Sequence, residues 1–136
     1  MKIYVGCALK HAPKEYKVAI ANLKKDLAQL PHVEILEFVT TEAAPQEIYT
    51  NDIIDCVMTC DIMIAECSHP SLGLGYEIAT MIEKRRKPVL IYAHADALVS
   101  GLILGAPQEY ASCTRYVDIS EIVEHVREYV QKHLHD

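Results

Sequence analysis

The sequence predicts an α/β fold: a single-domain, Rossmann- or flavodoxin-like three-layer sandwich with a five-stranded parallel sheet. Short, continuously apolar segments alternate along the chain with longer segments of helical apolar spacing, and the connections between them are short. Strands that are apolar throughout are typical of a parallel sheet covered by helices on both faces. The 136 residues contain no repeat, linker or low-complexity segment, so we expect one domain over residues 1–136.

The first half of the chain supplies two strands and two helices. KIYVGC (Lys2–Cys7) reads as an apolar strand. Residues 14–30 have an apolar stripe with lysines on the other side, which predicts a helix ended by Pro31. VEILEFV (33–39) predicts the second strand, and a helix is expected over about 45–59, with proline in its first turn.

The second half is expected to contain three strands and three helices. In order, these are strand 61–67, helix 71–86, strand 88–92, a short helix around 98–104, strand 115–119, and a closing amphipathic helix that Ser120 would cap.

Composition excludes several classes of function. The net charge of −6 argues against a nucleic-acid polymer as partner, because phosphate backbones select basic faces. No run of about 18 apolar residues exists to cross a membrane, and the immediate start of a strand leaves no room for a signal peptide. We therefore expect a cytoplasmic protein without membrane association.

Five cysteines, an odd number scattered among apolar neighbours, indicate reduced thiols. Cys56, Cys60, Cys67 and His69 offer metal-ligand atoms, but their spacing matches no usual zinc pattern. We expect neither a metal nor a cofactor.

The most informative stretch is DIMIAECSHPSLGLGYE, residues 61–77, which reads as a buried strand, a turn and a glycine-punctuated helix start. Ser71 is a candidate N-cap, and Gly73 and Gly75 would let the backbone approach a ligand closely. Glu77 falls in or near the first helical turn, where the helix dipole favours a carboxylate. A carboxylate beside a glycine-rich anion cradle suits nucleophilic attack on a sugar carbon bonded to a nucleobase. The alternative is a surface glutamate that only complements the dipole.

Parallel sheets of this kind bind ligands outside the carboxyl ends of their strands, where the strand order reverses. This rule brings Gly6 and Cys7, at the end of the first strand, into the same expected crevice as residues 67–75 and Glu77.

Five segments resemble, in the same order, the nucleoside 2-deoxyribosyltransferase superfamily. They are KIYVGC at the N-terminus, NDI at 51–53, CDIMIAECSHPSLGLGYEIA at 60–79, KPVLIY at 87–92 and LVSGLILGA at 98–106. The most specific part, AE-x-x-x-PS-x-G-x-GYE at 65–77, looks most like the 2′-deoxynucleoside 5′-monophosphate N-glycosidase branch. The resemblance implies hydrolysis of (deoxy)nucleoside 5′-monophosphates to free base and (deoxy)ribose 5-phosphate, through a covalent glycosyl–glutamate intermediate.

The resemblance assigns catalytic roles to three residues. Glu77 matches the nucleophile, Tyr4 the tyrosine that orients it, and Asp52 an aspartate that contacts the base and manages its proton. The spacing from Asp52 to Asp61 is one residue longer than in the family pattern, so Asp55 is a second candidate. Without the resemblance, Tyr4 would be a core aromatic and both aspartates would lie on a solvated helix face.

The resemblance also implies a phosphate site and a dimer. Ser71 and Gly73 match positions that hold the 5′-phosphate, whereas the transferases carry an aspartate at the position of Ser71, which would repel a phosphate. Ser100 resembles a residue lent across a dimer interface, so a homodimer or higher homo-oligomer with the Ser100 region at the interface is expected; otherwise it is a helix cap. The family's Ser-Ile-Arg-Gly-like phosphate loop is replaced by Cys7-Ala8-Leu9-Lys10, where Lys10 offers only a point charge.

Three other functions remain open from the sequence. A nucleoside 2-deoxyribosyltransferase would exchange bases through the same intermediate. A non-catalytic nucleotide-binding module would have no need of Tyr4 and Glu77 together. A flavodoxin-like FMN protein is disfavoured because no aromatic residue marks a flavin-stacking loop.

Overall fold

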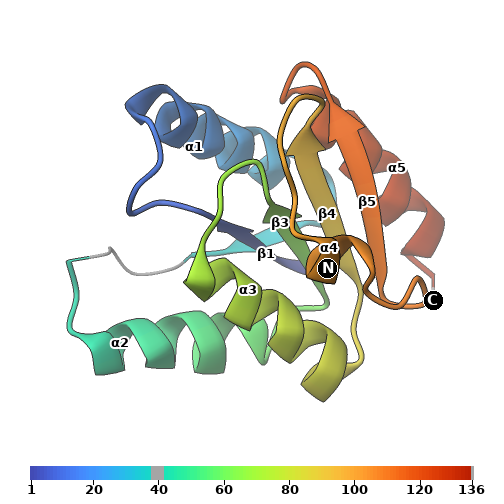
Figure 1. Ribbon diagram of the computed structural model, residues 1–136. Helices are drawn as coiled ribbons and strands as arrows, with labels where there is room; N and C mark the ends of the chain where they lie inside the picture. The colour runs from blue at the N-terminus through green and yellow to red at the C-terminus, as the bar shows by residue number, and fades with distance from the viewer. Residues whose placement is uncertain (38–41, 136) are drawn as a thin grey trace.

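A computed structural model of the protein describes residues 1–37 and 42–135. It shows five parallel strands in the order β2–β1–β3–β4–β5, flanked by helices, which confirms the predicted fold class (Figure 1). The elements are β1 (Lys2–Cys7), α1 (Lys14–Ala28), β2 (Glu34–Leu36), α2 (Pro45–Tyr49), the π-helix η1 (Thr50–Val57), β3 (Ile62–Glu66), α3 (Leu72–Ala79), the π-helix η2 (Thr80–Arg85), β4 (Val89–His94), α4 (Gly101–Leu104), β5 (Ala111–Tyr116) and α5 (Glu121–His133).

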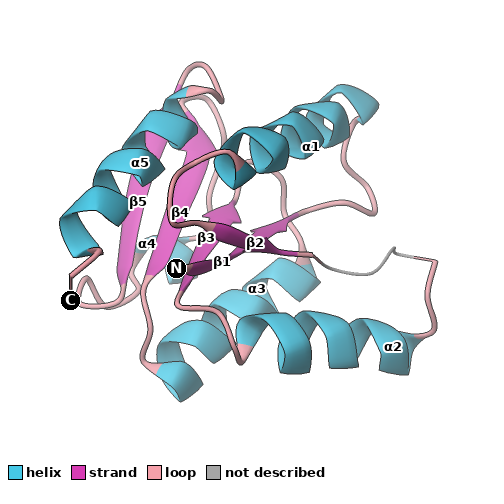
Figure 2. Cartoon of the chain, turned by 180° about the vertical axis from the view of Figure 1, so that it is seen from behind, coloured by secondary structure: helices cyan, strands magenta, loops and turns pink. Residues whose placement is uncertain are grey.

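The sheet separates two apolar cores. Helices α1 and α5 cover one face, and α2 and α3 with their π-helical extensions cover the other (Figure 2). Because side chains alternate along a strand, Ile3 and Val5 of β1 join the α1/α5 core, while Tyr4 between them joins the α2/α3 core. The sequence alternation therefore turns Tyr4 toward the helix that carries Glu77.

The strand order reverses between β1 and β3. Gly6 pairs with Ala65 and Cys7 with Glu66, so the carboxyl ends of these two central strands lie side by side. The loops that leave them diverge to opposite faces, β1 leading to α1 and β3 to α3, as in other doubly wound sheets. This divergence opens the end of the sheet to a ligand.

The fifth strand was predicted wrongly. It spans Ala111–Tyr116, not 115–119, and pairs with β4 from Val89 opposite Ala111 to His94 opposite Tyr116. At this edge of the sheet Ser112 and Cys113 are exposed, so the strand has no continuous apolar run to reveal it.

Other boundaries differ less. The helix expected over 45–59 is the continuous pair α2 and η1, and that expected over 71–86 is α3 and η2. The second strand is shorter than predicted, and its expected residues 38 and 39 lie outside the described part of the chain. Ser120 makes no side-chain cap bond; the carboxylate of Glu121 instead accepts hydrogen bonds from the Val117 and Asp118 amides, at 2.8 and 2.7 Å.

All five cysteines are free thiols, and only Cys113 is exposed. Within the described residues, no helix is long and apolar enough to cross a membrane.

Candidate active site

Glu77 is one of two buried charged side chains in the described part of the chain; the other is Glu66. It is the sixth residue of α3 and 8% exposed, so it lies in the second helical turn. Its Oε2 accepts a short hydrogen bond from the Tyr4 hydroxyl, the orienting contact that the resemblance implies. Helix α3 and strand β1 thus bring together two residues that are 73 positions apart.

Glu77 lies beyond the first helical turn, to which the dipole argument applies, and burial has the largest effect on its pKa. Burial raises the pKa of Glu77 from 4.5 to about 7, and the Asp52 charge adds to the rise. The hydrogen bond from Tyr4 and the charge of Lys24 oppose it. Burial, and then the Glu77 charge, raise the pKa of Tyr4 far above its ordinary value, so the phenol stays protonated and donates. Glu77 is therefore an acid that titrates near neutral pH.

Gly6 allows α3 to approach β1 at this point. A Cβ built at Gly6 would lie 2.5 Å from Met63 Cε, 3.0 Å from Leu74 Cδ1 and 3.6 Å from Glu77 Oε1. Real Cβ atoms essentially never come within 3.0 Å of another heavy atom, so the Met63 methyl would have to move aside and Leu74 Cδ1 to give way slightly. The predicted site residue Gly6 therefore leaves room for these two side chains beside Glu77.

Asp52 lies on η1, half-buried, and its charge acts on both Tyr4 and Glu77. Its Oδ1 is buried and has no hydrogen-bond partner among the described residues. Burial raises its pKa above the ordinary value, although Lys24 opposes the shift. An unpaired buried oxygen is costly, and a catalytic role is one of the reasons for which a protein retains one.

The segment from Asp52 toward Asp61 is π-helical. The Met58 amide donates to the Ile53 carbonyl at 2.8 Å, a bond spanning five residues where an α-helix spans four. Such a turn holds one more residue than an α-helical turn. Asp55 is exposed, with its carbonyl bonded to the Thr59 hydroxyl, so Asp52 is the aspartate on the Tyr4 and Glu77 side.

Sequence reasoning missed Lys24. It was assigned to the solvated side of α1, yet it is half-buried, and burial lowers its pKa. The charges of Cys7, Glu37, Asp52 and Glu77 act on it in the opposite direction. Its helical spacing was the available signal, because Lys24 lies four residues after Ile20 and three before Leu27, and both are buried. Lys24 supplies positive charge to a site with two carboxylates.

Four of the predicted residues line a cavity of about 1240 Å³. Ser71, Gly73, Gly75 and Ser100 all contribute to it, together with Lys10. Its walls are the loop 8–11, the start of α3 and the segment from Leu98 to Pro107. Glu77, Tyr4 and Asp52 are not among its lining residues, but Leu74, one turn before Glu77, is. The predicted residues therefore form two adjoining groups, one buried and one open.

Ser71 is the N-cap of α3, as predicted: its Oγ accepts from the Leu74 amide at 3.2 Å. Ser100 caps the four-residue α4 by accepting from the Leu102 amide at 3.3 Å, the alternative given for it above.

Cys7 is half-buried, and burial raises its pKa to about 11. In residues 1–37 and 42–135, no three His, Cys, Asp or Glu side chains are arranged to hold a metal ion.

Comparison with known proteins identifies the family. No family model matches the sequence. A protein of Thermofilum pendens, provisionally named 2′-deoxynucleoside 5′-phosphate N-hydrolase 1, is 32% identical over 136 residues, covering 91% of each chain. This chain belongs to the nucleoside 2-deoxyribosyltransferase superfamily. A relative from Methanosarcina barkeri with the same provisional name is 34% identical over 100 residues, covering 74% of this chain and 60% of that protein.

Two solved structures share the fold of this superfamily member. The CMP N-glycosidase BcmB of Clostridium botulinum superimposes with a TM-score of 0.72 at 20% identity, covering 95% of this chain and 99% of that one. The 2-desoxiribosyltransferase of Leishmania mexicana superimposes with a TM-score of 0.58 at 19% identity, covering 91% and 97%. Likeness at these identities establishes the fold alone.

Proposed function

We propose that this protein is an N-glycosidase that hydrolyses (deoxy)nucleoside 5′-monophosphates to free base and (deoxy)ribose 5-phosphate. The observation that carries the proposal is the buried hydrogen bond between Tyr4 of the central strand β1 and Glu77 of α3. Family membership supports it, since the relatives above are provisionally named as 5′-phosphate N-hydrolases.

Glu77 acts as the nucleophile. Tyr4 holds Oε2, which leaves Oε1 to bond to C1′ of the sugar as the bond from C1′ to the base nitrogen breaks. Positive charge develops on the sugar in this step, and an ionised Glu77 stabilises it before bonding covalently. With a pKa of about 7, roughly half of Glu77 is ionised at neutral pH in the free protein. Water then attacks C1′ as the bond from C1′ to Glu77 breaks, and it gives its proton to Asp52, which restores both carboxyl groups.

Asp52 delivers the proton that the departing base needs. The electron pair of the bond between C1′ and the base nitrogen leaves with the base. A positioned acid typically accelerates such a departure by about 10²–10⁴-fold. The raised pKa of Asp52 increases the fraction that carries a proton, and its unpaired Oδ1 is available to a base.

The 5′-phosphate occupies the open cavity. Ser71 and Gly73 stand at the start of α3, where amides and the helix dipole favour an anion, and Lys10 lines the same cavity. Because residue 71 is a serine, no carboxylate stands at this position to repel the phosphate.

A second copy of the chain covers the cavity rim in a homodimer. Leu72, Leu98 and Leu102 are 96%, 95% and 85% exposed and flank the cavity that Ser100 lines. Apolar patches of this kind typically mark an interface. Light scattering should report a dimer, and Leu102→Lys should shift it toward monomer.

The free thiols accord with a reducing compartment such as the cytoplasm.

The test is chromatography of the protein incubated with deoxynucleoside 5′-monophosphates and the matching nucleosides, with and without a second free base. The proposal expects free base from the monophosphates and no exchanged product, and at least about 10³-fold less from Glu77→Gln. New nucleoside that forms only with added base would instead identify a transferase. No turnover of any substrate would favour the binding-module alternative.

A further inference from the structure

Glu66, the second buried carboxylate, lies outside the site described above. It ends β3, is 0% exposed, and follows Ile62 and Ile64 on the α1/α5 face of the sheet, opposite to Glu77. A fully buried carboxylate is retained only when several donors satisfy it.

Three hydroxyls and one amide converge on Glu66. Tyr16 of α1 donates to Oε2 and Ser68 to Oε1 in short hydrogen bonds, and Tyr116 of β5 donates to Oε1 at 2.9 Å. The Ser68 amide lies 3.3 Å from both oxygens. Burial, followed by the Glu66 charge, raises the pKa of Tyr16 far above its ordinary value. Burial raises that of Tyr116 to about 12, so both phenols remain donors at neutral pH.

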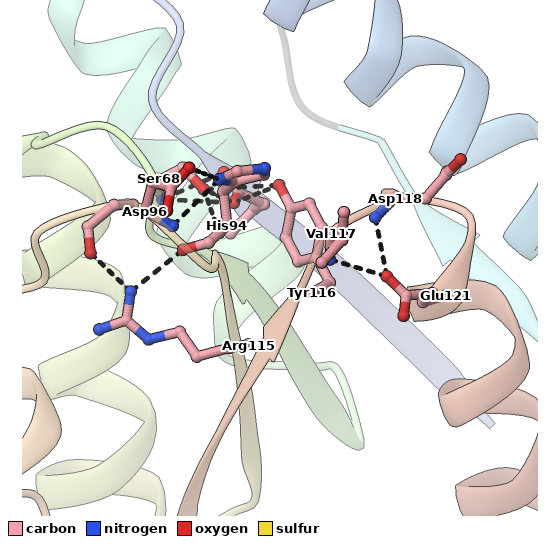
Figure 3. A network of polar contacts seen from close by, with 10 residues as sticks. Ser68, His94, Asp96, Arg115, Tyr116, Val117, Asp118 and Glu121 are labelled. Carbon is pink, nitrogen blue, oxygen red and sulfur yellow. Dashed lines mark hydrogen bonds and ion pairs between the residues drawn. The ribbon is translucent and has the colours of Figure 1, made fainter.

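This network fixes the turn that leads to α3. Ser68 is the residue through which it acts: its Oγ also accepts from the His94 amide at 2.8 Å, at the end of β4 (Figure 3). On one side of Ser68, the Cys67 amide donates to the Tyr92 carbonyl at 2.7 Å. On the other, the His69 ring meets the edge of the Tyr16 ring with centroids 4.5 Å apart. Two residues later the chain reaches Ser71, the cap of α3.

The turn matters because it positions one wall of the cavity. His69, Pro70 and Ser71 line the cavity, whereas Ser68 and Glu66 do not. Glu66 therefore touches neither the cavity nor Glu77, yet its bonds determine where the lining residues stand.

We propose that Glu66 is a positioning residue for phosphate recognition: by holding Ser68 it fixes residues 67–71, and so places Ser71 and the first amides of α3 in the cavity. The inference rests on the proposed function for its kinetic consequence, but not for its structural one. An acceptor-only group is needed at Glu66, because a glutamine amide would bring donors of its own and leave a hydroxyl unpaired.

The experiment compares Ser68→Ala and Glu66→Gln with Tyr92→Phe, a matched control. Tyr92 is a buried tyrosine of the neighbouring strand whose hydroxyl bonds to His125, so its loss removes a buried hydroxyl bond without touching Glu66. Ser68→Ala is the decisive variant if Glu66→Gln does not fold. Hydrogen–deuterium exchange is measured on the free proteins, and steady-state kinetics on a deoxynucleoside 5′-monophosphate and its nucleoside.

Amides 68–75 should exchange about tenfold faster in Ser68→Ala than in wild type or Tyr92→Phe, because the hydroxyl that bonds to Glu66 and His94 is lost. KM for the monophosphate should rise about tenfold, while kcat and KM for the nucleoside stay within about twofold. A merely structural role would instead reduce turnover of both substrates in parallel, or affect Tyr92→Phe equally, and either result overturns the proposal. If wild type cleaves neither substrate, the proposed function fails, while unchanged exchange in Ser68→Ala still refutes the positioning of the turn.

Discussion

The Tyr4 hydroxyl donates to Glu77 Oε2 across the boundary between the central strand β1 and helix α3. The bond connects a phenol that stays protonated to a carboxyl group that titrates near neutral pH. It therefore fixes the direction of the carboxylate and moderates the effect of burial on its charge.

The Glu77→Gln variant should become more stable relative to wild type as pH rises. The pKa of Glu77 is about 7 in the folded protein and near 4.5 otherwise, so its stabilising contribution is fully present below about pH 4.5 and is lost as pH rises through about 7. The variant has no such loss. Its free energy of unfolding relative to wild type should increase by up to about 3 kcal/mol between pH 4.5 and 7.5. Urea titrations at several pH values measure this, with exposed Glu128→Gln as control; a pH-independent difference would contradict the raised pKa.

Tyr4→Phe should shift the pH dependence of catalysis upward. The Tyr4 hydrogen bond lowers the pKa of Glu77, so removing the hydroxyl raises that pKa above about 7 and less carboxylate is ionised at neutral pH. The acidic limb of kcat/KM should move to higher pH, with partial recovery of the rate in alkaline buffer. An unshifted limb with a uniformly lower rate would show that Tyr4 only shapes the site.

Asp52→Asn and Asp55→Asn form a matched pair three residues apart on the π-helix η1. Asp52 is half-buried with an unpaired oxygen, whereas Asp55 is exposed. Loss of the acid at Asp52 should lower kcat by about 10²–10⁴-fold, while Asp55→Asn should stay within about twofold. Equal effects of both changes in the same assay would reject the assignment of Asp52 as proton donor.

Lys24→Met should also displace the acidic limb to higher pH. The Lys24 charge lowers the pKa of both Glu77 and Asp52, so its removal lets both rise. The neighbouring Lys25 is exposed, and Lys25→Met serves as control. A pH–rate profile compares the two; identical profiles would mean that Lys24 acts on neither carboxylate.

Local sequence signals predicted the central strands and the cap at Ser71 because those features depend on neighbouring residues. β5 was misplaced because an edge strand has only one neighbour, and its exposed Ser112 and Cys113 remove the apolar run that marks buried strands. Glu77 was a candidate from the glycine-rich stretch around it, whereas Tyr4 and Asp52 came from the family resemblance, because their separation from Glu77 in the chain gave no independent signal. Glu66 was invisible because Tyr16 and Tyr116 each lie 50 residues from it.

The state of the cysteines has a practical use. Burial raises the pKa of Cys7 and Cys60 to about 11 and of Cys56 and Cys67 to about 12. At neutral pH a thiol with pKa 11 is ionised in about one molecule in 10⁴, and only the thiolate reacts quickly with alkylating reagents. Cys113 is exposed on the edge strand β5. A maleimide dye should therefore attach there alone, marking the sheet edge for fluorescence without first replacing the other cysteines.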